Sequence, residues 1–341
     1  MSLSSYHTHS TYSDGKSTLE EMVQSAIEQG CEEIGFSDHA PMSFRCDWSA
    51  RAEKIESYKK EVKELKEKYK GKIKIFLGIE QDYFSTPAEG YDYIIGSVHF
   101  VYKDGEYIPV DISAEEVKSY IDRLYGGDVY GYCEDYFKLV KDIYKVTKCQ
   151  IIGHFDLVTK FNERMPLIDI NHPRYVKAVD DALETLLDTP AIFEVNTGAI
   201  SRGYRTTPYP DDRTMEIIAK KGKQFVITSD THHRDTVTFN FAEQEKALTE
   251  KGYKYIKSLG AILKPYDYHT YDYHTKEEIV ARDHARTDMI AAEPLEAETG
   301  TKCKSEISLE QAGKIGASMV RRMIEKYENE LRKKAAENEE D

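Results

Sequence analysis

The feature that most constrains the fold of this chain is where its histidines and carboxylates lie relative to its apolar segments. Short segments rich in β-branched and aromatic residues lie at residues 4–9, 33–37, 73–79, 93–98, 150–153, 191–195 and 224–229. Most of them end in, or lead directly into, residues of the metal-ligand type: His7, His9, Asp38, His39, Glu80, His99, His154, Asp230 and His232. The carboxyl ends of the strands in a parallel barrel open on one face, so this shared polarity predicts an α/β barrel that gathers these side chains.

Helical patterns separate the expected strands. Ser17 and Glu20 have the spacing of a capping box, and the apolar stripe that follows ends at Gly30. Residues 51–70 have apolar positions at alternating steps of three and four, with a lysine- and glutamate-rich opposite face. Further helices are expected after Ser113 and over residues 134–147. Seven strands, each followed mostly by helix, therefore favour a barrel of βα units.

The βα pattern ends near residue 260. We therefore expect one catalytic domain over residues 1–260, a partly disordered linker over 261–304, and an amphipathic helical tail over 305–341. The linker repeats the segment Tyr-Asp-Tyr-His-Thr at 266–270 and 271–275. Every ligand candidate precedes residue 233, so we expect that His269, His274 and His284 bind no metal ion.

Composition limits the possible partners and the location of the protein. The net charge of −14 opposes binding of a polyanion unless a local basic groove overrides it. No apolar segment reaches the roughly 18 residues that a membrane span needs, and the N-terminus lacks a signal-peptide pattern, so we expect a cytoplasmic protein. The five cysteines show no C-x-x-C spacing, and we interpret them as reduced and not as ligands.

The residue types at the strand ends suit a site that binds several metal ions. His7 and His9 lie at i and i+2 of one strand, so both imidazoles face the same side, and Asp230 and His232 share this spacing. A carboxylate such as Glu80 can bridge two cations. Any one of these histidines alone is more often a hydrogen-bonded structural residue. Together, at one end of a barrel, they predict a polynuclear centre for hydrolysis.

These motifs, taken in order, carry a family resemblance. The segments are His7-Thr-His9, Ser13-Asp14-Gly15, Ser37-Asp38-His39-Ala40-Pro41, Gly78-Ile79-Glu80, Gly96-Ser97-Val98-His99, Gly153-His154-Phe155-Asp156 and Ser229-Asp230-Thr231-His232. Over about residues 3–258 the chain resembles the polymerase and histidinol phosphatase (PHP) family, and within it the histidinol-phosphatase branch. The branch assignment also draws on Glu194-Val-Asn-Thr-Gly198 and the arginines after it.

The resemblance implies a distorted (β/α)₇ barrel, here with a C-terminal helical extension, that holds two to three divalent ions. His7, His9, Glu80 and Asp230 would bind the first ion, and Glu80 would bridge to a second ion held by His99 and His154. Asp14, His39 and His232 would bind a third ion. Some relatives with three ions have histidine at the position of Asp14, which leaves the third site open. The nitrogen and oxygen ligands suit zinc, manganese or iron.

The implied activity is hydrolysis of L-histidinol phosphate, a small phosphomonoester, by water that the metal ions activate. Arg202, Arg205 and Lys160 lie just past strand-end motifs and are the phosphate-binding candidates, although each could be ordinary surface charge. Asp38 adjoins a ligand, and we expect it to orient an imidazole more than to act as an acid. Asp156 could hold a cationic group of the substrate, and His233 could equally face solvent.

Two other functions remain open. A PHP nuclease or phosphodiesterase would share the metal ligands, but the chain has no basic stripe for nucleic acid. Residues 311–324 resemble the C-terminal helix of small acid-soluble spore proteins, which coat DNA, so the tail could bind nucleic acid instead of docking as a plain amphipathic helix. No membrane partner is expected.

Overall fold

The computed structural model describes residues 3–261 and residue 263. Within them, one sheet of eight strands has the order β1-β2-β3-β4-β7-β8-β9-β10, and every neighbouring pair is parallel. Its strands are β1 (Leu3–Ser5), β2 (Cys31–Phe36), β3 (Lys74–Asp82), β4 (Tyr93–Ser97), β7 (Ile151–Ile152), β8 (Ile192–Asn196), β9 (Phe225–Thr228) and β10 (Tyr255–Ile256). A separate antiparallel hairpin consists of β5 (Phe100–Lys103) and β6 (Glu106–Pro109).

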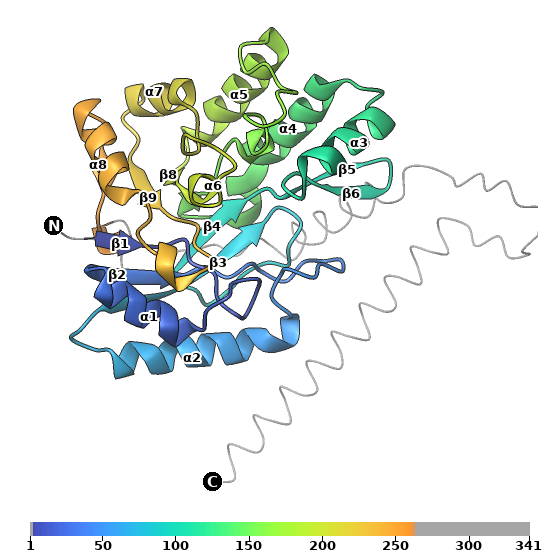
Figure 1. Ribbon diagram of the computed structural model, residues 1–341. Helices are drawn as coiled ribbons and strands as arrows, with labels where there is room; N and C mark the ends of the chain where they lie inside the picture. The colour runs from blue at the N-terminus through green and yellow to red at the C-terminus, as the bar shows by residue number, and fades with distance from the viewer. Residues whose placement is uncertain (1–2, 262, 264–341) are drawn as a thin grey trace, which may run out of the picture. The chain divides into compact units, whose positions relative to one another are not determined.

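Helices connect the parallel strands and cover the outside of the sheet (Figure 1). Helix α1 packs on β2, α2 on β3, α4 on β4 and α8 on β9. The helices are α1 (Leu19–Glu28), α2 (Ile55–Lys68), α3 (Ala114–Leu124), α4 (Val129–Thr147), α5 (Pro173–Leu186), α6 (Gly198–Ser201), α7 (Asp212–Lys220) and α8 (Phe241–Glu250). Short 3-10 turns lie at Ala52–Lys54, Leu157–Thr159, Arg234–Thr236 and Leu259–Ala261. None of the described helices is both long and apolar enough to cross a membrane.

The sheet closes into a barrel through the segments that follow β1 and β9. Thr8 and Thr231 form a parallel bridge. The Thr231 amide donates to His7 O at 3.1 Å, and the His9 amide donates to Thr231 O at 2.9 Å. The expected α/β barrel is therefore confirmed, with β10 as an eighth short strand that the sequence pattern did not indicate.

Side chains from five strands, together with Tyr6 just after β1, fill the inside of the barrel. Tyr6, Tyr93, Ile95, Ile151, Ile192, Val226 and Ile256 form one buried cluster. The Tyr93 ring needs room that a neighbouring side chain would occupy, because a Cβ at Gly78 would lie 2.3 Å from that ring. This packed interior makes the barrel a solid support, and its carboxyl end presents the functional residues.

One expected helix start was wrong by a residue. Thr18, not Ser17, caps α1, and its hydroxyl and the Glu21 carboxylate form the capping box. The Ser17 hydroxyl instead accepts a hydrogen bond from the Arg234 amide at 3.1 Å, which ties the start of α1 to the loop after β9. The expected linker, the tail and the histidines at 269, 274 and 284 lie outside the described residues.

Candidate metal centre

The structure brings all nine metal-ligand candidates together at the carboxyl end of the barrel. His7 and His9 follow β1, His39 follows β2, His99 follows β4 and His154 follows β7, while Glu80 lies in the last part of β3. Asp230 and His232 follow β9, and Asp14 lies in the loop between β1 and α1. Asp230 has a φ of +45°, a conformation that aspartate tolerates better than most residues and that turns the chain at the strand end.

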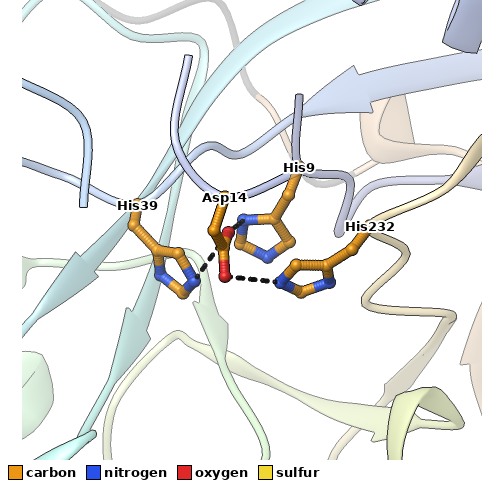
Figure 2. A group of neighbouring side chains, drawn as sticks. All are labelled: His9, Asp14, His39 and His232. Carbon is orange, nitrogen blue, oxygen red and sulfur yellow. Dashed lines mark ion pairs between the residues drawn. The ribbon is translucent and has the colours of Figure 1, made fainter. Parts of the chain in front are cut away.

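Four overlapping groups of these residues have ligand atoms that all lie within 4.8 Å of one another. The groups are His7 with His9 and Asp230; His7 with Glu80 and His154; His39 with Glu80 and His99; and His9 with Asp14, His39 and His232. Figure 2 shows the last group, in which Asp14 lies 3.7 Å from His39 Nε2 and 3.3 Å from His232 Nε2. The first group matches the first-ion ligands that the resemblance implies, apart from Glu80, and the last group adds His9 to those of the third ion.

Glu80 lies between the groups and turns each carboxylate oxygen toward different imidazoles. Its Oε1 lies 2.9 Å from His154 Nε2 and 3.4 Å from His99 Nε2. Its Oε2 lies 2.9 Å from His39 Nδ1 and 3.2 Å from His7 Nε2. This is the arrangement expected of a carboxylate that bridges two cations.

The buried polar atoms of the cluster lack partners and so fit a metal centre. His7 Nε2, both ring nitrogens of His9, Glu80 Oε2 and His154 Nδ1 are buried without a hydrogen-bond partner. Leaving such atoms unpaired costs about 1–3 kcal/mol each, and folded proteins rarely tolerate several at one point. A shared bound cation would satisfy lone pairs that converge in this way.

The electrostatics keep the carboxylates ionised and divide the imidazoles between neutral and protonated forms. Burial, helped by nearby His232 and His39, lowers the pKa of His9 to about 3, so its imidazole is neutral. Burial alone would raise the pKa of the Glu80 and Asp230 carboxyls. The imidazoles around Glu80, and Arg202 and His7 beside Asp230, instead hold both pKa values well below their usual range. Although burial opposes it, the neighbouring carboxylates raise the pKa values of His7, His39 and His154, that of His39 to about 9, so a divalent ion that bound there would displace protons from these imidazoles.

Carboxylates outside the cluster support its members, and the sequence reasoning did not single out two of them. Glu194 of β8 accepts from His7 Nδ1 at 2.5 Å, and Asp82 of β3 lies 3.2 Å from His99 Nδ1. Glu194 lies between Phe193 and Val195 in a buried strand, which is the signal that could have identified it, whereas Asp82 ends β3 directly after Glu80 and Gln81. Asp38 accepts hydrogen bonds from Ser10 and Ser13 and thereby holds the loop between His9 and Asp14.

A cavity of about 750 Å³ opens over the cluster. Among the phosphate-binding candidates, Arg202 and Lys160 line it. Arg202 donates to Asp230 O at 2.8 Å and to its carboxylate at 3.0 Å, and the Lys160 ammonium donates to Asp111 at 3.1 Å. Both cations therefore lie at the edge of the cluster.

Arg205 and Asp156 do not line this cavity. They lie in the wall of a second cavity of about 530 Å³, where the Arg205 guanidinium is 3.8 Å from the buried Asp156 carboxylate. Arg205 also donates to Thr159 Oγ1 at 2.6 Å, and Asp156 accepts from the Asp211 amide at 3.1 Å. The structure thus separates both residues from the cluster, because each already has a buried partner. His233 is exposed and pairs with Asp235, away from the centre.

Aromatic rings and carboxylates form the outer wall of the larger cavity. The Trp48 ring lies 4.4 Å from that of His39, and the Phe44 and Tyr107 rings stack at 3.9 Å. These rings come from the segment after β2 and from the β5–β6 hairpin. Asp47, Glu106 and Asp111 line the same cavity, and each is paired with a cation: Arg45, Arg123 and Lys160, respectively. The wall therefore suits a flat group that can stack on these rings.

Comparison with known proteins decides the family. The model of the PHP domain family matches residues 5–198, which is more than half of the chain. The chain belongs to the PHP domain family. A second model, of the alpha/beta-type small acid-soluble spore proteins, matches residues 290–331, outside the described part of the chain.

Relatives extend this PHP match over most of the barrel. A Schizosaccharomyces pombe protein named probable histidinol-phosphatase is 28% identical over 261 residues, covering 70% of this chain and 83% of the relative. The histidinol-phosphatase of Bacillus subtilis is 25% identical over 249 residues, covering 66% of this chain and 90% of the relative. The fold is also that of the Lactococcus lactis histidinol phosphate phosphatase, solved with zinc, L-histidinol and phosphate. That structure has a TM-score of 0.57 and 19% identity, and the match covers 74% of this chain and 95% of that one.

Proposed function

We propose that this PHP protein is a metal-dependent phosphomonoesterase that hydrolyses L-histidinol phosphate to L-histidinol and phosphate. The observation that carries the proposal is the composition of a single cavity. Six of the nine ligand candidates line its floor, Arg202 and Lys160 lie at its edge, and aromatic rings form its outer wall. Relatives named histidinol-phosphatase, matched over most of their own length, support the substrate.

The cluster would hold two to three divalent ions, and zinc, manganese and iron all suit its nitrogen and oxygen ligands. The ligands we propose are His7, His9, Asp14, His39, Glu80, His99, His154, Asp230 and His232. Ions held there would activate water for attack on phosphorus and offset the charge that develops on the phosphoryl oxygens.

The protein's own cations would orient the phosphoryl group. Arg202 and Lys160 lie on the cavity wall, and each is fixed by hydrogen bonds to a carboxylate, Asp230 and Asp111 respectively. Cations fixed in this way can offset the charge of the equatorial oxygens without having to reorganise during the reaction. Hence we assign phosphate binding to Arg202 and Lys160 and not to Arg205.

The outer wall would recognise the leaving group. Histidinol carries an imidazole and an amine, both of which can be positively charged. Stacking on Trp48 would favour such a group over one without a ring. An enzyme of this kind would act in the cytoplasm, on a substrate that diffuses freely.

A substrate panel tests this proposal. Phosphate release should be measured with histidinol phosphate, nucleoside monophosphates, glycerol phosphate and bis(p-nitrophenyl) phosphate, with and without added zinc or manganese. Histidinol phosphate should give the highest kcat/KM, and only when metal is present. Preferred hydrolysis of the diester, or exonuclease activity on single-stranded DNA, would instead identify a PHP nuclease or phosphodiesterase. DNA binding by the tail stays a separate prediction, which a gel-shift assay of the full chain can test.

A further inference from the structure

Glu194 is a buried carboxylate in β8, a strand that supplies no ligand to the cluster. It is 1% exposed, and its chain neighbours Phe193 and Val195 are buried in the core. A carboxylate removed from water in this way is stable only if hydrogen bonds replace the lost hydration. The partners of Glu194 therefore indicate why the barrel keeps it.

Four donors surround Glu194, two for each oxygen. Oε1 accepts from His7 Nδ1 and from the Thr228 hydroxyl, both at 2.5 Å. Oε2 accepts from the His154 amide at 2.7 Å and from Asn196 Nδ2 at 3.0 Å. The orientation of Asn196 is fixed independently, because its Oδ1 accepts from the Gly198 amide at 2.8 Å.

This arrangement decides which nitrogen of His7 carries the proton. With its Nδ1 proton directed at Glu194, the ring keeps its lone pair on Nε2. That atom lies 3.2 Å from Glu80 and 3.6 Å from Asp230, at the centre of the candidate ligands. We propose that Glu194 is a positioning residue that holds His7 in the tautomer and orientation needed to bind a metal ion, and that also fixes the backbone of His154. The inference rests on the metal-dependent function proposed above.

A glutamine at position 194 cannot reproduce these bonds. In one orientation its amide group faces the Nδ1 proton of His7, which forces the imidazole into the other tautomer and places a proton on Nε2. In the other orientation the amide group faces the His154 amide, which can only donate. Glu194→Gln therefore keeps the size of the side chain and loses either the required tautomer of His7 or the bond to the His154 amide.

A substitution of Asp82 should have a smaller effect on metal binding, and it can be compared with that of Glu194. Its Oδ2 accepts both from the His99 amide at 2.7 Å and from His99 Nδ1, while its Oδ1 accepts from the Phe84 amide at 2.7 Å. An asparagine can keep its carbonyl oxygen toward His99 and lose only the bond to Phe84. Asp82→Asn should therefore weaken metal binding less than Glu194→Gln.

The test measures metal binding without substrate. The full chain is stripped of metal and titrated with zinc against a competing chromophoric chelator. Glu194→Gln should bind zinc about 10- to 100-fold more weakly than the wild type at its tightest site, the usual cost of losing such a support. Glu33→Gln is the matched control, because Glu33 is a buried carboxylate of β2 that binds Tyr6, Lys74 and Ser258 and lies away from the cluster. Its affinity for zinc should equal that of the wild type.

A second measurement needs no variant. Nitrogen NMR of the zinc-loaded wild type, labelled in histidine, should show His7 protonated on Nδ1 and not on Nε2. The opposite tautomer would overturn the inference, as would a folded Glu194→Gln protein with wild-type zinc affinity. Either result leaves the proposed function standing if the wild type binds zinc, whereas a wild type that binds no divalent ion overturns both.

Discussion

Some charged residues around the candidate metal centre line the cavity, and others are buried and hold the loops that carry ligand candidates. Arg202 and Lys160 line the cavity. Asp38 is fully buried and accepts hydrogen bonds from the amides and hydroxyls of Ser10 and Ser13. We therefore interpret Asp38 as a support for the loop that carries Asp14, and not as a proton donor.

Substitutions of Asp38 distinguish these two roles. Asparagine can keep most of the bonds, because its amide group can donate to the Ser10 hydroxyl while its oxygen still accepts at the position of Oδ1. Asp38→Asn should therefore keep a kcat close to that of the wild type, while Asp38→Ala should lose about 1–3 kcal/mol of unfolding free energy in urea. If Asp38 transferred a proton, both variants would lose most of their turnover.

The side chains that the structure gathers as ligand candidates could be predicted residue by residue, and the carboxylates Glu194 and Asp82 that contact them could not. Histidines such as His99 and His154 can be recognised in the sequence because each directly follows an apolar segment that predicts a strand. Glu194 lies within β8 and Asp82 at the end of β3, and the sequence does not show which polar atoms they contact. Arg205 was expected at the phosphate, but the pattern contained no sign of its buried partner Asp156.

At the scale of elements, the outer wall of the cavity consists of two segments. The strand pattern did not predict that these segments pack against each other. Phe44 and Trp48 belong to the irregular segment after β2, and Phe100 and Tyr107 to the β5–β6 hairpin. Their rings meet only in the folded chain, with Trp48 stacked on Phe100 at 5.6 Å. Helical and strand periodicity could place the barrel but not this wall.

Trp48→Ala should raise the KM for histidinol phosphate about tenfold or more, since an aromatic contact with a cation contributes roughly 1–2 kcal/mol when desolvated. The KM for glycerol phosphate, which has no ring, should change little. Tyr130→Ala serves as the control, because Tyr130 stacks on His172 at 3.7 Å and does not line the cavity. Equal effects on both substrates would show that the indole supports the metal centre and not substrate selection.

Tyr6, which follows β1, connects the last described segment to the barrel through hydrogen bonds. The Tyr6 hydroxyl donates to Glu33 and accepts from the Leu259 amide at 2.8 Å, with all three residues buried. Tyr6→Phe leaves that amide without a partner and should cost about 1–3 kcal/mol of unfolding free energy. Tyr132→Phe should cost far less, because the Tyr132 hydroxyl is buried without a hydrogen-bond partner. Similar losses in urea unfolding of the two variants would contradict this account.

At the scale of the whole molecule, the residues of the candidate site and the residues that stabilise the end of the described chain lie in different parts of the barrel. The carboxyl end gathers the ligand candidates and the cavity, while the Tyr6 and Glu33 contacts secure β10 and the turn after it. The net charge of −14 fits a small substrate held by local cations better than it fits a long polyanion. The barrel and its polarity follow from the spacing of the strand-end motifs, because that spacing reflects the βα repeat, whereas the family follows from the likeness of the motifs themselves.

The most direct test of the metal-dependent mechanism is phosphate release from histidinol phosphate by one preparation in three states: as purified, stripped by a chelator, and reloaded with zinc or manganese. The account predicts that turnover disappears on stripping, returns on reloading, and stays absent in a folded Glu80→Ala variant under all three conditions. Undiminished turnover by the stripped protein, or near-wild-type kcat for Glu80→Ala, would contradict it.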